Sequence, residues 1–269
     1  MVKNCLSIAG SDCSGGAGIQ ADLKAFSALG TFGMSAVTSV VAENTQRVIS
    51  IQNVDTAVIA DQIDAVFEDV EVAAVKLGML PSVEIIRLVS EKLRQYQPKF
   101  VVCDPVMVAT SGDSLSGEGT AAALRDCIFP LADVVTPNMP EASALSGLRV
   151  ESITDFDAAA EVIMRSGAKA LLIKGGHADG AAVDVLYTEN GRQEFTAPRV
   201  DTKNTHGTGC TLSSAIAACL AKGADTPTAV AQAKEYISGA IANADKLNVG
   251  KGHGPTNHFF DYYNIKGII

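Results

Sequence analysis

Residues 204–211 read Asn204-Thr205-His206-Gly207-Thr208-Gly209-Cys210-Thr211, and they run directly into a stretch of small and apolar residues at 212–220. The apolar stretch predicts a buried helix, and the glycine-interrupted stretch predicts a loop that delivers free backbone N–H groups to the helix N-terminus. Such a terminus is an anion site, and Gly207 and Gly209 leave no Cβ between the backbone and an oxyanion. Cys210 would lie in the first turn, where the helix end favours thiolate over thiol. The stretch therefore predicts an anion hole with a base beside it; the alternative is an ordinary loop before a core helix with a buried structural cysteine.

Composition and charge limit the kind of protein that this chain can be. It has 269 residues, a formal net charge of −9 and no cluster of Lys and Arg. Nucleic acid and anionic membrane surfaces are therefore not expected as partners. We expect a single domain over residues 1–269, because no Pro- or Ser-rich linker interrupts the chain. The six cysteines show neither CxxC pairing nor zinc-ligand spacing, which is typical of reduced thiols in a cytoplasmic protein. The apolar runs are strand-sized, so no membrane span is expected.

Short apolar runs alternate with helical patterns along the chain. Strands are predicted at 5–9, 34–42, 73–77, 100–103, 134–135 and 170–173, and helices at 19–26, 59–67 and 85–96, with another beginning at 154–155. Repeated strand–helix units predict an α/β fold whose mainly parallel central sheet carries helices on both faces. Asn190-Gly191, between the strand-like runs 183–188 and 193–196, predicts a short antiparallel hairpin at one edge of the sheet.

Polar residues follow the predicted strands at the points where they end. They are Ser11 and Asp12, Glu43 and Asn44, Asp104, Asn138 with Glu141, and Lys174. In an open α/β sheet, ligands bind outside the carboxyl ends of the strands. Residues that serve only the hydrophobic core would show no preference for strand ends, so the pattern indicates an active-site crevice.

Three oxygen-rich residues among these have the chemistry of a magnesium site. Mg²⁺ is commonly held by one or two carboxylates together with substrate phosphates, and Asp104, Asn138 and Glu141 supply such oxygens. Glu141 also falls in the first turn of a predicted helix, where an acid is favoured by the helix dipole alone. Lys174 at a strand end and Lys234 on a late helix could each reach a phosphate, although a lone lysine on a helix is usually solvated.

Other ligand classes fit the motifs less well. The loop at 10–18 could open a dinucleotide site with Glu43 as the ribose ligand, but its glycines do not have the GxGxxG spacing. That reading also leaves the loop before Cys210 unexplained. No GxxxxGK[ST] motif occurs, so the chain is not a P-loop nucleotide enzyme. The four histidines lack metal-ligand spacing, and we assign no chemistry to His177, His206, His253 or His258.

Motifs spread over nearly the whole chain resemble those of one family. They are residues 8–12 with 14–24, Gly78-Met79-Leu80, Asp104-Pro105-Val106-Met107, residues 136–142, residues 174–177, residues 202–211 and Gly252-His253-Gly254-Pro255. The chain resembles the bacterial hydroxymethylpyrimidine/phosphomethylpyrimidine kinases of thiamine biosynthesis, which belong to the ribokinase-like superfamily. The stretch at 202–211 is the most specific, because related sugar kinases typically carry Asp where this chain has Cys210.

The resemblance implies an activity, its cofactors and a set of site residues. It implies a kinase that uses ATP and Mg²⁺ to phosphorylate the hydroxymethyl group of 4-amino-5-hydroxymethyl-2-methylpyrimidine, and then the monophosphate. By the same resemblance, Ala17, Glu43, Met79, Val106 and Cys210 line the pyrimidine pocket, while Asp104, Asn138, Glu141, Lys174 and Lys234 serve ATP and Mg²⁺. It also implies a homodimer.

Glu43 departs from the family pattern, in which the stretch Glu43-Asn44-Thr45 commonly begins with Gln. An ionised carboxylate only accepts hydrogen bonds, whereas the Gln amide both donates and accepts. Glu43 could take the 4-amino hydrogens of the pyrimidine and would favour a protonated ring nitrogen. Pyridoxal, with a comparable hydroxymethyl group, is the alternative substrate.

The expected mechanism is phosphoryl transfer by positioning and charge neutralisation. The amides of Gly207, Thr208, Gly209 and Cys210 would stabilise the transferring phosphoryl group. Cys210 would take the proton of the attacking hydroxyl, with the helix terminus lowering its pKa from the usual range. Two other classes remain as alternatives: a catalytically silent small-molecule sensor on the same fold, and a NAD-dependent oxidoreductase.

Overall fold

The computed structural model describes residues 1–107, 117–176 and 182–267, so His177 lies outside the described residues. One nine-stranded sheet runs through them in the order β3-β2-β1-β4-β5-β6-β7-β8-β9. The strands are β1 Asn4–Asp12, β2 Phe32–Asn44, β3 Arg47–Asn53, β4 Val72–Leu77, β5 Val101–Cys103, β6 Val134–Val135, β7 Ala170–Ile173, β8 Ala182–Thr188 and β9 Gly191–Ala197. From β2 through β7 neighbouring strands are parallel, which confirms the predicted fold class.

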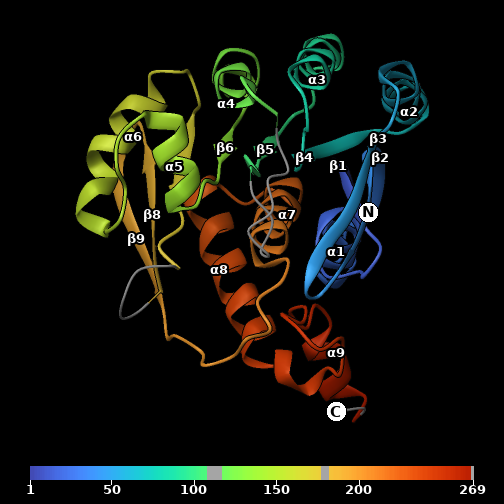
Figure 1. The fold of residues 1–269 in the computed structure, drawn as a ribbon, viewed down its shortest axis with the longest axis vertical. Helices are drawn as coiled ribbons and strands as arrows, with labels where there is room; N and C mark the ends of the chain where they lie inside the picture. Colours follow the sequence, from blue (N-terminus) through green and yellow to red (C-terminus); the bar gives the residue numbers. More distant parts are fainter. Residues whose placement is uncertain (108–116, 177–181, 268–269) are drawn as a thin grey trace.

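Helices cover both faces of this sheet (Figure 1). They are α1 Gly18–Ala28, α2 Thr56–Asp69, α3 Val83–Tyr96, α4 Thr120–Ala123, α5 Met139–Ser146, α6 Phe156–Met164, α7 Thr208–Ala221, α8 Thr226–Ala242 and α9 Phe260–Ile265. Helices α1, α7 and α8 lie on one side of the sheet, and α2 to α6 lie on the other. No helix in the described ranges is long and apolar enough to span a bilayer.

The two faces arise from the alternation of side chains along each strand. In β4, Ala74 packs in the core beneath α1, α7 and α8, while Val75 packs in the opposite core. Val134 and Val135 of β6 divide in the same way. The inner strands therefore need apolar residues at nearly every position, which is the continuous apolar pattern of a buried parallel strand.

Both edges of the sheet are antiparallel hairpins, of which the sequence predicted one. The pair β8–β9 is the predicted hairpin. At the other edge β3 pairs with β2, a pairing that the sequence pattern does not predict. Residues of β3 are almost all exposed, so burial imposes no apolar pattern there. Its turn is made by the Asn44 side chain, which accepts the backbone N–H groups of Gln46 and Arg47, and not by an Asn-Gly pair.

The strand order has its switch point between β1 and β4. Strands before β4 are added on one side of β1, and β4 to β9 follow on the other. At such a switch point the loops after two neighbouring strands diverge and leave room for a ligand. Residues 13–17 follow β1, Gly78 and Met79 follow β4, and α7 packs against both strands. The predicted site residues are carried on this edge.

Candidate active site

The loop before α7 is locked against the loop before α1. Gly207 is the residue before α7 and has φ +78°. A Cβ at Gly207 would lie 1.8 Å from the carbonyl oxygen of Gly16, so only glycine fits this contact. A Cβ at Gly16 would in turn lie 2.5 Å from the ring of His206. The glycines of the two loops thus serve close packing as well as the left-handed backbone that the turn needs.

The first turn of α7 offers fewer free amides than the sequence suggested. The amide of Thr208 donates to the Thr205 carbonyl at 3.2 Å, and the Thr208 hydroxyl donates to the same oxygen at 2.7 Å. The amide of Thr211 already donates to Gly207. Gly209 and Cys210 lie between these, at positions where a helix provides no preceding carbonyl. The anion hole is therefore centred on Gly209 and Cys210 rather than on the whole stretch.

Asp12, at the end of β1, holds the loop at residues 10–18 in shape. Its carboxylate accepts the amides of Ser14, Gly16 and Ala17 at 2.7, 2.9 and 2.7 Å, and it lies 2.9 Å from Nε2 of His206. Burial alone would raise the pKa of Asp12, but the His206 contact and the loop hydrogen bonds hold it well below its usual range. An ionised carboxylate only accepts, so Nε2 of His206 carries the hydrogen that joins the two loops.

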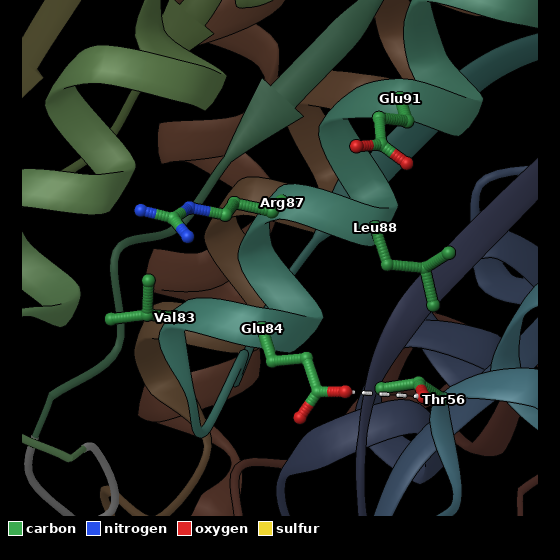
Figure 2. A pocket seen from close by; sticks show the side chains of 6 residues that line it. All are labelled: Thr56, Val83, Glu84, Arg87, Leu88 and Glu91. Atoms are coloured by element: carbon green, nitrogen blue, oxygen red, sulfur yellow. Dashed lines mark hydrogen bonds between the residues drawn. The ribbon is translucent and has the colours of Figure 1, made fainter.

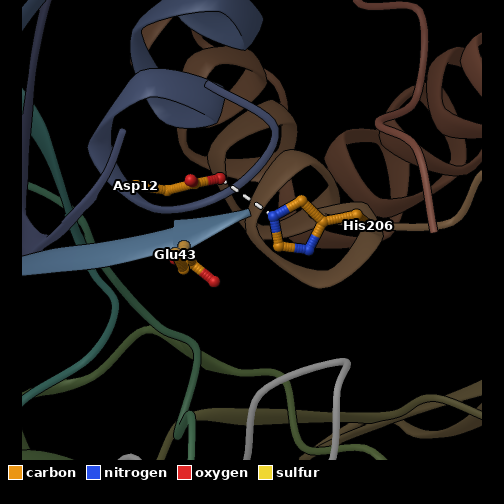
Figure 3. A group of neighbouring side chains, drawn as sticks. All are labelled: Asp12, Glu43 and His206. Atoms are coloured by element: carbon orange, nitrogen blue, oxygen red, sulfur yellow. Dashed lines mark hydrogen bonds and ion pairs between the residues drawn. The ribbon is translucent and has the colours of Figure 1, made fainter. Parts of the chain in front are cut away.

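Glu43, at the end of β2, faces this pair (Figure 3). One polar atom from each of Asp12, Glu43 and His206 lies within 4.8 Å of the other two. The spacing would suit a cation, but four N–H groups already point at the Asp12 oxygens and would repel one. The cluster is better understood as a loop anchor with an acidic side chain beside it.

The residues predicted to line the pyrimidine pocket follow four neighbouring strands. Ala17 precedes α1, Glu43 is the next-to-last residue of β2, Met79 follows β4 and Val106 follows β5, while Cys210, also predicted for the pocket, lies in the first turn of α7. A Cβ at Gly10 would lie 3.1 Å from the Met79 sulfur, so Met79 closes over the end of β1. The Cys13 thiol donates to the Glu43 carbonyl at 3.1 Å and links the first loop to β2.

Asp104 and Lys174 form an ion pair beside α7. Lys174 Nζ lies 2.8 Å from Asp104 Oδ1, and both side chains are nearly buried. A Cβ at Gly209 would lie 3.3 Å from Lys174 Nζ and 3.4 Å from Asp104 Oδ2. The ion pair therefore borders the anion hole directly.

Asn138 and Glu141 cap α5 and adjoin the same ion pair. Asn138 accepts the Glu141 amide and Glu141 accepts the Asn138 amide, both at 2.8 Å, in a capping box. The same Glu141 oxygen lies 4.0 Å from Lys174 Nζ. The helix-capping role considered from the sequence is thus present, and it places a carboxylate next to Asp104.

Burial and charge shift the pKa values in this cluster. Burial raises the pKa of Glu141 to about 7, despite the opposing effect of Lys174. Burial would lower the pKa of Lys174, but Asp104 and Glu141 raise it overall. The Lys174 ammonium offsets only part of the charge of the two neighbouring carboxylates, so a divalent cation would be favoured beside them. Asp104 and Glu141 therefore fit the predicted magnesium site.

Lys234 does not contact this cluster through any hydrogen bond or ion pair shown for the described residues. Its Nζ lies 2.7 Å from Asp184 Oδ2 on β8, and Asp184 Oδ1 accepts the amide of Gly175 at 3.0 Å. Lys234 is thereby tied to the residue that follows Lys174. Its direct role toward ATP stays a prediction.

Cys210 differs from the expectation in its ionisation. Burial raises the pKa of Cys210 to about 12, although Lys76 lowers it in part. The expected lowering by the helix terminus is therefore wrong for this structure. The Cys210 side chain is only partly exposed, and the cost of desolvating its thiolate outweighs the effect of the helix dipole.

Several residues that shape the site had no assigned role. The sequence assigns no role to His206 because the histidines lack metal-ligand spacing, yet His206 bonds Asp12. Its position within the glycine-rich loop is the sequence feature that could have identified it. Lys76 and Asp22 form a fully buried ion pair beneath the site. The signal for Lys76 was a charge inside the strand at 72–77, where every neighbour is apolar.

A separate groove lies on α3 near the start of α2 (Figure 2). Its lining residues are Thr56, Val83, Glu84, Arg87, Leu88 and Glu91. Thr56 Oγ1 lies 3.5 Å from Glu84 Oε1 across it. None of the predicted site residues lines this groove.

Comparisons with known proteins agree on one family. Residues 12–257 match the family described as phosphomethylpyrimidine kinase. The chain is 48% identical over 265 residues to the hydroxymethylpyrimidine/phosphomethylpyrimidine kinase of Rhizobium meliloti, covering 98% of this chain and 99% of that relative. Its structure is similar to that of Bacillus subtilis pyridoxal kinase in an ADP complex, with a TM-score of 0.89, 41% identity, and 96% and 98% of the two chains covered. It is also similar to Staphylococcus aureus pyridoxal kinase in complex with AMP-PCP and pyridoxal, with a TM-score of 0.88, 34% identity, and 98% and 96% covered.

Proposed function

As a member of the phosphomethylpyrimidine kinase family, the chain is an ATP-using kinase of thiamine biosynthesis, and we propose how its site performs two phosphoryl transfers. The first acceptor is the hydroxymethyl group of 4-amino-5-hydroxymethyl-2-methylpyrimidine, and the second is the resulting monophosphate. One observation carries the proposal: Gly209 in the first turn of α7 borders the Asp104–Lys174 pair. Anion-binding amides and a carboxylate–lysine pair thus converge where a triphosphate would meet the pyrimidine pocket.

Each group at this edge has a part in the transfer. The amides of Gly209 and Cys210 would donate to the oxygens of the transferring phosphoryl group. Lys174 would neutralise phosphate charge from the side of β7. Asp104 and Glu141 would hold Mg²⁺, which when bound offsets the charge of the triphosphate. Asn138 positions Glu141 through the capping box, and Lys234 acts from the side of α8.

Cys210 receives the proton of the attacking hydroxyl in the first transfer. A thiolate is needed for this, and burial makes that form scarce near pH 7. The first transfer should therefore become faster as the pH rises. The second acceptor is a phosphate that is already largely ionised near pH 7, so the second transfer should depend less on Cys210.

The test is the substrate preference of the purified protein. ADP release is measured with the pyrimidine alcohol, its monophosphate and pyridoxal, in the native chain and in Glu43→Gln. We expect the highest kcat/KM with the two pyrimidines. A preference for pyridoxal would favour vitamin B6 salvage, the second candidate, which the similarity to two pyridoxal kinases supports. Absence of ADP release with all three compounds would favour the catalytically silent sensor. A thermal shift with NAD would favour the NAD-dependent oxidoreductase.

We also propose that the protein acts as a cytoplasmic homodimer. The hairpin β2–β3 exposes Val40 and Ile49, two large apolar side chains of the kind that a second copy could cover. The described cysteines are all free, which suits a reducing compartment. Light scattering during size-exclusion chromatography measures the mass; a monomer at all concentrations would contradict the dimer.

A further inference from the structure

Lys76 is a lysine in the middle of a fully buried strand. It belongs to β4, and its side chain and that of Asp22 from α1 are both 0% exposed. Lys76 Nζ lies 2.9 Å from each oxygen of the Asp22 carboxylate. Such a pair is costly to desolvate, and apolar residues of similar size are often as stable or more stable in its place. Stability alone therefore does not explain it.

Asp22 joins the pair to two further elements. It accepts the Ser7 hydroxyl of β1 at 2.6 Å and the Ser214 hydroxyl of α7 at 2.7 Å. The network connects β1, α1, β4 and α7. These four elements carry the first loop, Met79 and Cys210 at their ends, so the network lies under the proposed site.

The Lys76 ammonium lies beside Gly78, and its partner Asp22 is bonded to a residue one helical turn after Cys210. A Cβ at Gly78 would lie 2.8 Å from Lys76 Nζ, and Gly78 is the residue before Met79. Ser214, which bonds Asp22, is four residues after Cys210 on α7. Side chains at this spacing lie on one face of a helix, with Cβ atoms about 5–6 Å apart.

The charge of Lys76 is fully buried and is therefore weakly screened. Charges in a buried site are screened far less by salt and water than surface charges. Burial would lower the pKa of Lys76, but Asp22 outweighs it and keeps the ammonium protonated. Among the charged groups that act on Cys210, Lys76 has the largest effect and lowers its pKa, while Asp22 and Asp104 oppose it.

We propose that Lys76 is a positioning residue for the first phosphoryl transfer: its ammonium, fixed by Asp22, stabilises the thiolate of Cys210 that accepts the substrate proton. In that step the hydroxyl oxygen bonds to the γ-phosphorus, the bond from that phosphorus to the bridging oxygen of ADP breaks, and the hydroxyl proton moves to Sγ. This inference rests on the proposed role of Cys210.

Three variants separate charge from architecture. Lys76→Met leaves the Asp22 charge buried without its partner, so this protein should be destabilised. Lys76→Met/Asp22→Asn removes both charges and leaves an amide that can still bond Ser7 and Ser214. Lys92→Met is the matched control, because it breaks the Lys92–Asp64 pair of 2.6 Å between α3 and α2, away from the site.

The first readout is the rate at which iodoacetamide alkylates Cys210 at a pH below the pKa of the thiol. Peptide mass spectrometry measures the alkylated fraction. There the rate is proportional to the thiolate fraction, and a rise of one in the pKa slows it about tenfold. We expect slower alkylation in both Lys76 variants, by less in the double variant because Asp22→Asn also removes a charge that raises the pKa of Cys210. We expect no change in Lys92→Met. The second readout is kinetic: kcat for the first transfer should fall with Lys76 variants while the KM for ATP is kept.

The double variant decides between the two roles. If the Lys76–Asp22 pair were only structural, a double variant with the native melting temperature would also have the native alkylation rate and kcat. That result would overturn the proposal. Recovery of stability without recovery of either rate supports it. If Lys76→Met does not fold, the double variant alone supplies both measurements.

Failure of the proposed function gives a different pattern. If the native chain phosphorylated none of the three acceptors, the alkylation of Cys210 would still respond to Lys76 as stated. If it phosphorylated the pyrimidines but alkylation were unchanged in the double variant, the function would stand and the inference about Lys76 would fail.

Discussion

The ionisation of Cys210 leads to a sharp prediction about the pH dependence of the first transfer. Burial places the pKa of its thiol at about 12. At pH 8 the thiolate fraction is then about 10⁻⁴. Since kcat/KM reports the ionisations of the free enzyme, a reaction that needs this thiolate becomes about tenfold faster for each pH step of one. We expect this slope for the pyrimidine alcohol between pH 7 and 10.

Substitution of Cys210 should abolish the slope. In Cys210→Ala we expect kcat for the first transfer to fall by about 10²–10⁴-fold, the usual contribution of a general base, while ATP binding survives. The second transfer should lose less, because its attacking phosphate needs no base. Coupled ADP-release assays on both acceptors give the profiles, and Cys127→Ser, which removes a half-buried thiol in the helical segment after α4, is the control.

Two results would refute this reasoning. A flat profile of kcat/KM in the native chain would show that no thiolate is required. The same slope in Cys210→Ala would assign the ionisation to another group. Equal losses in the two transfers would mean that Cys210 packs against the ring in both and removes a proton in neither.

Three further predictions concern the pocket, the metal site and the loop. Glu43→Gln should change the ratio of kcat/KM for the pyrimidine alcohol and pyridoxal by at least about tenfold, since a hydrogen bond to a charged group contributes about 1.5–3 kcal/mol; an unchanged ratio removes Glu43 from selectivity. The folded-state pKa of Glu141 is raised to about 7, so its contribution to stability is complete below about 4.5 and is lost as the pH rises through 7. The free energy of unfolding of Glu141→Gln should therefore rise relative to that of the native chain from pH 5 to pH 8, by at most about 3 kcal/mol, and the variant should lose the stabilisation by Mg²⁺ and ADP; a stability difference that does not change with pH would contradict this. Gly207→Ala should lose stability and activity because its Cβ meets Gly16, whereas Gly223→Ala, also left-handed at φ +101° but in open space, should cost only about 1–2 kcal/mol of backbone strain; equal melting temperatures for the two would argue against the contact.

The sequence predicts well those parts of the fold in which burial restricts the choice of residues. The strands β1, β4, β5, β6 and β7 are buried on both faces, so their apolar runs mark them, and the Asn-Gly turn marks β8–β9. The exposed strand β3 carries no such constraint, and its turn depends on one Asn44 side chain. Edge elements that face solvent on both sides leave little pattern to detect.

The same physical distinction explains what the sequence could reveal of the site. Residues at strand ends are recognisable because position alone brings them to one edge of the sheet, and Asp104, Glu141 and Lys174 do meet there. The ionisation of Cys210 could not be inferred that way. A helix N-terminus lowers the pKa of a thiol and burial raises it, and only the packing around the first turn of α7 decides which effect is larger. The partners of Lys76 could not be predicted from the sequence either. Its strand predicts that Lys76 is buried, but only the packing of α1 and α7 brings Asp22 and Ser214 to it.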